Sequence, residues 1–99
     1  MNIEKKIDNT KLEISLEGRL DTSTSPMLEA ELKRSIDDNI DELVFDFKKL
    51  EYISSSGLRI LLAAQKVMNK QGKMIIKNVN DIVYEVFEVT GFLDILTIE

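Results

Sequence analysis

Hydrophobic and polar residues alternate most clearly near the start of the chain. Leu12, Ile14 and Leu16 are separated by polar residues, and this period of two predicts a strand with one solvated face. Residues 3–7 form a weaker strand pattern, and the Asp-Asn pair that follows them is typical of a turn. We therefore expect an antiparallel hairpin at this end of the chain.

Three later segments place apolar residues at helical spacing, as Leu28, Leu32 and Ile36 do in the first of them. Ser25 is suited to cap the first helix, and Pro26 suits its first position. The second helix is expected to begin at the serines of residues 54–56 and the third at residues 80–81. Their predicted ends lie near residues 39, 72 and 90.

Other apolar runs predict further strands. Residues 43–47 read Leu-Val-Phe-Asp-Phe, which is typical of a strand covered on both faces in a parallel sheet. Residues 74–76 and 95–98 predict two shorter strands, while residues 18–25 and 48–53 are expected to be loops. The order is ββαβαβαβ, in which strands alternate with helices. We expect a single α/β domain over residues 1–99, with helices packed on a mixed, mostly parallel sheet.

Composition narrows the classes of function. The 99 residues include 18 Asp plus Glu against 13 Lys plus Arg, a net charge of -5, which disfavours binding to nucleic acids or anionic membranes. Cys and His are absent, which excludes disulfides, Cys nucleophiles, Ser–His–Asp catalysis and the common zinc sites. The first residues form no hydrophobic signal region, and no run of 18 apolar residues occurs. We expect a cytoplasmic protein without a metal or cofactor.

Candidate chemistry lies where the second predicted helix begins. Ser54, Ser55, Ser56 and Gly57 stand there in succession. The free amides and positive dipole end of a helix favour an anion, so a phosphate on one of these serines would be partly stabilised. Serine is also among the best helix caps, and capping alone is the alternative explanation.

Several segments in register carry a family resemblance. Gly-Arg-Leu-Asp at residues 18–21 resembles the Gly-x-Leu/Ile-Asp segment that follows the second strand of STAS domains, the fold of bacterial anti-sigma factor antagonists. Residues 44–47 resemble the third strand of that family, and residues 52–58 (Tyr-Ile-Ser-Ser-Ser-Gly-Leu) resemble its phosphorylation segment. The turns at residues 72–73 and 89–92 are also similar, so the resemblance covers essentially the whole chain.

The resemblance implies a protein-binding switch. Family members bind an anti-sigma factor that is also a serine kinase, release it when it phosphorylates them, and are reset by a serine phosphatase. The phosphorylated serine lies two places before the glycine, which is Ser55 here. Many members have Asp just before that serine, where this chain has Ser54, so Ser54 is the alternative acceptor. Ser56 maps to the small position before Gly57 and is expected to pack rather than to be presented.

The resemblance also assigns roles to flanking residues. Asp21 and Asp46 are expected on the same rim as the serines, where they would shape the acceptor loop or help to hold the Mg²⁺-bearing kinase site. Asp21 could instead only organise its own turn, whereas Asp46 interrupts an apolar run and needs a partner if buried. Thr22 and Ser23 are expected on this rim, as partner contacts or as capping residues. Arg59 is expected to be solvated, and contact with the partner or the phosphate is the alternative.

The leading hypothesis is thus an anti-sigma factor antagonist whose partners are a kinase and a phosphatase. The second is a stand-alone STAS protein of another bacterial kinase–phosphatase signalling or transport-associated complex, which binds a partner or a small ligand. An enzyme is less favoured, because P-loop, Rossmann and nucleophile-elbow motifs are absent and no nucleophile has an evident base. A structural α/β domain without a switch is the remaining alternative.

Overall fold

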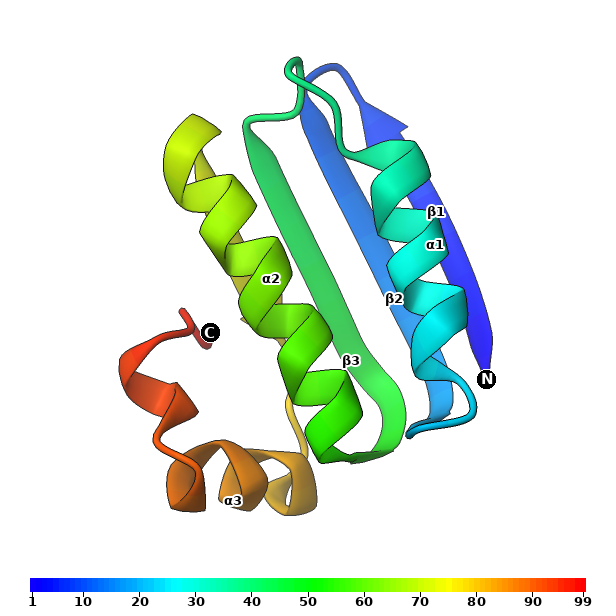
Figure 1. Ribbon diagram of the computed structural model, residues 1–99, viewed down its shortest axis with the longest axis vertical. Coiled ribbons are helices and arrows are strands. Elements are labelled where there is room, and N and C mark those ends of the chain that lie inside the picture. Colours follow the sequence, from blue (N-terminus) through cyan, green and yellow to red (C-terminus); the bar gives the residue numbers. More distant parts are fainter.

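The computed structural model describes residues 1–99 and is built around a four-stranded sheet (Figure 1). The strands are β1 (Asn2–Asp8), β2 (Lys11–Leu20), β3 (Glu42–Ile53) and β4 (Lys73–Lys77), in the spatial order β1-β2-β3-β4. β1 pairs antiparallel with β2, and the β2–β3 and β3–β4 pairs are parallel. The predicted hairpin and the mixed, mostly parallel sheet are therefore confirmed.

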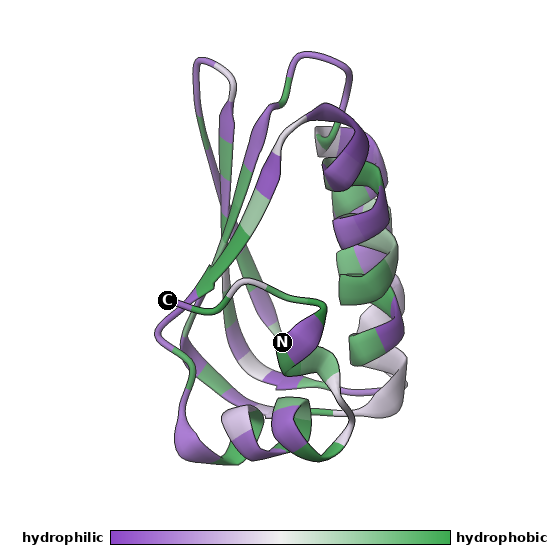
Figure 2. Ribbon diagram, turned by 90° about the vertical axis from the view of Figure 1, so that its left-hand side faces the viewer, coloured by the Kyte–Doolittle hydropathy of each residue, from purple (hydrophilic) through white to green (hydrophobic).

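Two long helices cover one face of the sheet and leave the other face bare (Figures 1 and 2). The helices are α1 (Ser25–Ser35), α2 (Ser55–Gln71) and α3 (Asp81–Val89), followed by a short 3-10 turn, η1 (Phe92–Asp94). α1 and α2 lie side by side over the sheet and run roughly along the strands, whereas α3 lies at the end of the sheet where α2 begins. None of these helices has the length and apolar character needed to cross a membrane.

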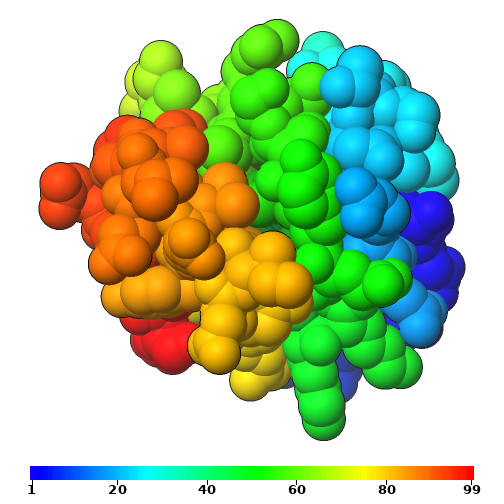
Figure 3. Space-filling view, turned by 90° about the horizontal axis from the view of Figure 1, so that it is seen from below, coloured from blue at the N-terminus to red at the C-terminus, as the bar shows by residue number.

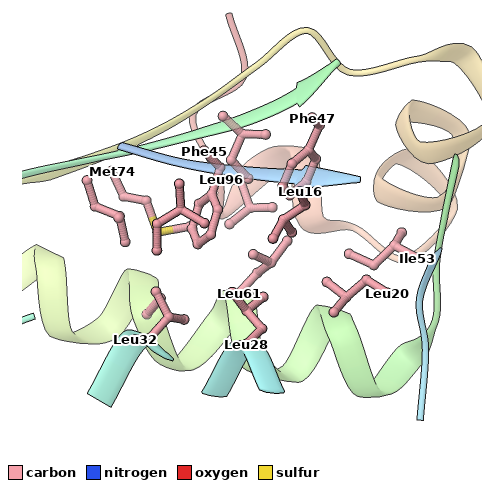
Figure 4. Packing of buried hydrophobic residues seen from close by; sticks show 14 of the residues in the cluster. Leu16, Leu20, Leu28, Leu32, Phe45, Phe47, Ile53, Leu61, Met74 and Leu96 are labelled. Atoms are coloured by element: carbon pink, nitrogen blue, oxygen red, sulfur yellow. The ribbon is translucent and has the colours of Figure 1, made fainter. Parts of the chain in front are cut away.

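The core lies between the sheet and the two long helices. Figure 4 shows Phe45 and Phe47 of β3 pointing towards the helices, where Leu28 of α1 and Leu61 of α2 face them. All four side chains are fully buried, and the two phenylalanine rings lie 5.7 Å apart at a tilt of 54°. Burying each side chain of this size contributes about 1.5–3 kcal/mol, so the face of β3 that carries the phenylalanines holds the two layers together.

Two strands run further than the apolar pattern predicts. β2 continues to Leu20 and β3 continues to Ile53, so parts of both expected loops are strand. The pairing of β2 with β3 is irregular between Ser15 and Glu17 and again between Gly18 and Arg19. These irregularities let the strands bend while Leu20 and Ile53 stay paired and buried against the core.

The prediction that residues 95–98 form a last strand was wrong. The chain first forms η1, and only Ile98 then pairs with β4, in one parallel bridge to Ile76. The amide of Ile76 donates to Thr97 O at 2.9 Å, and the amide of Glu99 donates to Ile76 O at 2.8 Å. The observed order is therefore ββαβαβα with a bridged C-terminal segment.

The helix ends match the prediction at four places and differ at two, and one of the matches is the end of α3 at Val89. Asn80 caps α3, since its Oδ1 accepts from the amide of Val83 at 2.8 Å, and α2 ends at Gly72. A Cβ at Gly72 would lie 1.8 Å from Asp41 O, so only glycine permits this close approach. Thr24 rather than Ser25 is the N-cap residue of α1, and α1 ends at Ser35 instead of near residue 39. The remaining agreement, the cap of α2, belongs to the candidate site.

Glu31 joins α1 to the edge of the sheet. Its carboxylate accepts from Ser35 Oγ at 2.8 Å and from Arg34 Nη2 at 3.1 Å, and Lys5 Nζ of β1 lies at 3.3 Å. These contacts, with the Ser35 hydroxyl first and the Arg34 guanidinium next, lower the pKa of Glu31 from 4.5 to about 2. The ionised carboxylate of Glu31 is therefore stabilised more in the folded chain than in the unfolded chain.

This carboxylate should make a pH-dependent contribution to stability. Its folded pKa is depressed, so the contribution is fully present above pH 4.5 and is lost as the pH falls towards about 2. Urea unfolding of wild type and Glu31→Gln should show a wild-type advantage at neutral pH that shrinks across this window. An advantage of constant size from neutral pH to pH 2 would contradict the assignment.

Candidate functional site

The three serines at the start of α2 lie in three different environments. Ser54 is the N-cap: its amide donates to Leu20 O at 2.9 Å, and its Oγ accepts from the Gly57 amide at 3.4 Å. Ser56 is half-buried, and its Oγ lies 3.2 Å from Thr22 Oγ1. Ser55, the first residue of α2, is exposed, and its hydroxyl makes no hydrogen bond within the chain. Of the three hydroxyls, that of Ser55 is the one free to react with another molecule.

Gly57 brings the first turn of α2 against the sheet. A Cβ at this position would lie 2.7 Å from Leu20 Cγ and 2.8 Å from Ile53 Cγ1. These side chains end β2 and β3, and both are fully buried. The glycine therefore fixes the start of α2 on the strand ends, which orients Ser55 towards solvent.

Asp21 organises the turn between β2 and α1. Its Oδ1 accepts from Ser23 Oγ at 2.8 Å, from the Ser23 amide at 3.0 Å and from the Thr24 amide at 3.2 Å. The Ser23 hydroxyl is the main cause of the lowered pKa of Asp21, and the Thr24 and Ser23 amides add to it. Asp21 is thus an ionised turn residue, and the turn it orders carries Thr22 to the side of Ser56.

Two residues without a role in the sequence analysis also lie at this end of the sheet. The guanidinium of Arg19 stacks over the ring of Tyr52, 4.3 Å from its centroid, and Arg19 Nε lies 3.9 Å from Asp21 Oδ2. Arg19 and Tyr52 are partners in the β2–β3 pairing. They therefore extend the polar rim from Asp21 across two strands.

Arg59 lies one helical turn after Ser55, so the two side chains share a face of α2. It is exposed and forms no ion pair within the chain. Arg59, Thr22 and Ser56 line one depression between the first turns of α1 and α2. A cation without an ion-pair partner thus lies on the same face of α2 as the exposed serine hydroxyl.

Asp46 is not part of this rim. It lies between Phe45 and Phe47 in β3, and because these face the helices, Asp46 points to the bare face of the sheet. Its Oδ1 accepts from Asn78 Nδ2 at 2.9 Å and from the Lys48 amide at 3.0 Å. Desolvation raises the pKa of Asp46, but these two hydrogen bonds and the nearby lysine charges outweigh it, so the net shift is downward. Asp46 thus has the hydrogen-bond partners that a carboxylate in a strand needs, but the prediction that it lies on the rim with the serines was wrong.

The remaining candidates meet at one end of the molecule. Figure 3 views this end, where the β2–α1 turn, the start of α2 and α3 lie next to one another. The candidates brought together are Asp21, Thr22, Ser23, Ser54, Ser55, Ser56, Gly57 and Arg59. The chain contains no group of three or more acidic side chains placed to hold a metal ion. The rim offers hydroxyls and two exposed cations, Arg19 and Arg59, on a rigid base.

Comparisons with known proteins identify relatives. The chain is 38% identical over 84 residues to BtrV of Bordetella bronchiseptica, whose name places it among anti-sigma factor antagonists; the match covers 84% of this chain and 72% of BtrV. It is 29% identical over 97 residues to the anti-sigma-B factor antagonist of Staphylococcus aureus, which covers 97% of this chain and 90% of that protein.

Solved structures show the same fold. The unphosphorylated form of the anti-sigma factor antagonist SpoIIAA superposes with a TM-score of 0.85 at 20% identity, covering 99% of this chain and 88% of SpoIIAA. The phosphorylated form of SpoIIAA from Bacillus superposes with a TM-score of 0.77 at 19% identity, covering 99% and 91% of the two chains. The family model of the STAS domain matches residues 2–99. Because that match spans nearly the whole chain, the protein belongs to the STAS domain family.

Proposed function

We propose that this protein is an anti-sigma factor antagonist that binds an anti-sigma factor serine kinase and is switched off by phosphorylation of Ser55. The observation that carries the proposal is the exposed, unpaired hydroxyl of Ser55 between two serines that are both engaged. The names of the curated relatives support the antagonist role. Such a protein acts by binding rather than by catalysis, and it works in the cytoplasm, where its kinase finds ATP.

The position of Ser55 suits a kinase substrate. In the transfer, Ser55 Oγ attacks the γ-phosphorus of ATP, the bond to the ADP oxygen breaks, and the hydroxyl proton passes to a base of the kinase. The kinase supplies that base and the Mg²⁺, so this chain has only to present an accessible hydroxyl. Ser54 and Ser56 would first have to give up their contacts with Gly57 and Thr22.

The product of the transfer also fits this end of α2. A phosphate on the first residue of a helix lies at the positive end of its dipole, next to free amides. Arg59 is one turn away on the same face and has no other ion-pair partner. The phosphorylated chain is thus expected to keep its fold, with the change confined to the surface that the kinase contacts.

Phosphate would act on binding through charge and bulk. It adds about −1.5 to −2 charge at neutral pH to a surface that already carries ionised Asp21. A kinase surface fitted to the bare Ser55 hydroxyl would meet both the charge and the added volume. We propose that Asp21, Thr22, Ser23 and Arg59 surround Ser55 as partner contacts. A serine phosphatase would reset the switch.

Mass spectrometry of the intact protein and its peptides tests the acceptor. Wild type, Ser55→Ala, Ser54→Ala and Ser56→Ala would each be incubated with ATP and an extract of the native cells. We expect one phosphate on wild type, Ser54→Ala and Ser56→Ala, and none on Ser55→Ala.

Each other outcome has a definite meaning. Loss of phosphate only in Ser54→Ala would move the acceptor to Ser54 and keep the switch. Wild type without phosphate, in an extract whose kinases phosphorylate a control substrate, would refute the switch itself.

A further inference from the structure

The net negative charge of the chain is confined to its C-terminal segment. Residues 1–77 contain 13 acidic and 13 basic residues, whereas residues 78–99 contain no Lys or Arg. The segment carries five acidic residues, all exposed and none in an ion pair: Asp81, Glu85, Glu88, Asp94 and Glu99. The segment that forms α3 and η1 thus holds the whole net charge of -5.

Exposed apolar side chains gather on the same segment. Seven large hydrophobic residues of the molecule are strongly exposed, and four of them lie here: Ile82, Tyr84, Val89 and Ile95. Val89 is the most exposed of the seven, at 74%, followed by Ile82 at 61%. Scattered apolar residues are normal on a surface, but a concentration on one short element marks an interaction site.

The residues of α3 divide into two apolar faces. Val83 and Phe87 are fully buried, and Asn80 at the start of the helix donates to Leu50 O of β3 at 2.8 Å, so this face is used in the fold. Ile82, Val86 and Val89 recur at intervals of four and three residues and form a second stripe, in which Ile82 and Val89 are exposed and Val86 is half-buried against the core.

An acidic row borders the second stripe. On the helical wheel, Glu85 lies directly beside the stripe, and Asp81 and Glu88 follow on the same side. Figure 3 shows α3 at the end of the molecule, next to the start of α2. The surface therefore presents an apolar line and an anionic line in parallel over the two turns of α3.

We propose that this surface of α3 is a docking site for a basic amphipathic helix of a partner protein. Aliphatic side chains of that helix would cover Ile82, Val86 and Val89, and its Lys or Arg residues would pair with Glu85 and Glu88. A second copy of this chain is disfavoured, because it would bring another segment with five acidic residues and no Lys or Arg against this one. An anionic membrane is repelled for the same reason.

The docking site goes beyond the proposed switch and does not rest on it. No residue of α3 takes part in the contacts of Ser54, Ser55 or Ser56. A partner held on α3 would nevertheless stand next to the start of α2, since both lie at the same end of the molecule. The test therefore uses neither the kinase nor ATP.

The probe is a synthetic 18-residue helical peptide with Leu on one stripe and Lys on the flanking positions. It would be titrated into the ¹⁵N-labelled full-length chain while amide chemical shifts are followed. We expect saturable shifts centred on residues 81–95. A matched peptide with Glu in place of Lys is expected to bind at least about tenfold more weakly.

Variants locate the contact. Glu85→Lys/Glu88→Lys and, separately, Val89→Ser should each weaken peptide binding by about tenfold, while the amide spectrum shows that the fold is kept. Glu4→Lys/Glu17→Lys on the bare sheet face and Val67→Ser on α2 are the matched controls, since all three residues are exposed and lie elsewhere. These control variants should bind as wild type does.

Four results would overturn the proposal. The first is a set of shifts that maps away from α3, and the second is an affinity unchanged by Glu85→Lys/Glu88→Lys. The third is sedimentation showing a dimer that Val89→Ser abolishes, which would assign the surface to a second copy. The fourth is cosedimentation with phosphatidylglycerol vesicles, which would assign it to a membrane.

Discussion

Phosphorylation of Ser55 is expected to weaken binding to the kinase by about 100-fold or more, which corresponds to roughly 2.7 kcal/mol of binding free energy. Ser55→Asp should reproduce part of this loss, because Asp adds charge but less volume than a phosphate. Ser55→Ala should bind within a few-fold of the unmodified chain, because the hydroxyl makes no contact within the fold whose loss could propagate. The measurement is isothermal titration of each form with the kinase that phosphorylates it.

The folding stability of the Ser55 variants should not fall in step with their affinity for the kinase. Ser55 is the first residue of α2, and a negative charge there interacts favourably with the helix dipole, by about 0.3–1 kcal/mol on an exposed surface. The unfolding midpoint of Ser55→Asp should therefore equal or slightly exceed that of wild type. A fall in stability that parallels the loss of binding would show that the substitution damages the fold, and the switch would lose its support. Unchanged affinity of the phosphorylated chain would contradict the switch directly.

The sequence predicted the elements best where one periodicity continued without interruption. The alternation around Ile14 and the helical stripe around Leu61 fixed the N-terminal hairpin and the second helix, because each pattern has one buried face. Lys48 and Lys49 interrupted the apolar run of β3 and suggested a loop. The strand continues because Leu50 and Ile53 return to the core beyond a bend that no local pattern reveals.

The face of the sheet on which Asp46 lies could have been predicted from the sequence. Side chains alternate across a strand, so two buried phenylalanines on either side place the carboxylate on the opposite face. The run of apolar residues instead suggested that both faces were covered. In the structure the helices cover only one face of the sheet, so the expectation that both faces are covered was wrong.

The pairing of Arg19 with Tyr52 could not be predicted in the same way. Their contact depends on the register of β2 against β3, which shifts between Gly18 and Arg19. The environments of the serines depend likewise on tertiary contacts. Leu20 O accepts a hydrogen bond from the Ser54 amide, and Thr22 contacts Ser56, so the partners come from the end of β2 and the turn after it, more than 30 residues earlier in the chain.

Replacing the glycine that follows the serines should destabilise the fold through the same contacts. In Gly57→Ala, the added methyl group meets buried atoms of Leu20 and Ile53 at 2.7–2.9 Å, so the first turn of α2 must move away from the strand ends. Overpacking of this kind costs about 1–3 kcal/mol. Urea unfolding should show that loss, and the amides of the first turn of α2, where Ser55 stands, should exchange faster with solvent.

A double-mutant cycle separates this steric cause from a general effect of alanine. Leu20→Ala removes two of the three crowding atoms, Cγ and Cδ2, and leaves Ile53 Cγ1 in place. The cost of Gly57→Ala should therefore be smaller in the Leu20→Ala background, although Leu20→Ala alone costs about 2–5 kcal/mol. Equal costs in both backgrounds would refute the steric explanation. Close contact with the strand ends would then not be the reason that Gly57 is needed at the start of α2, next to Ser55.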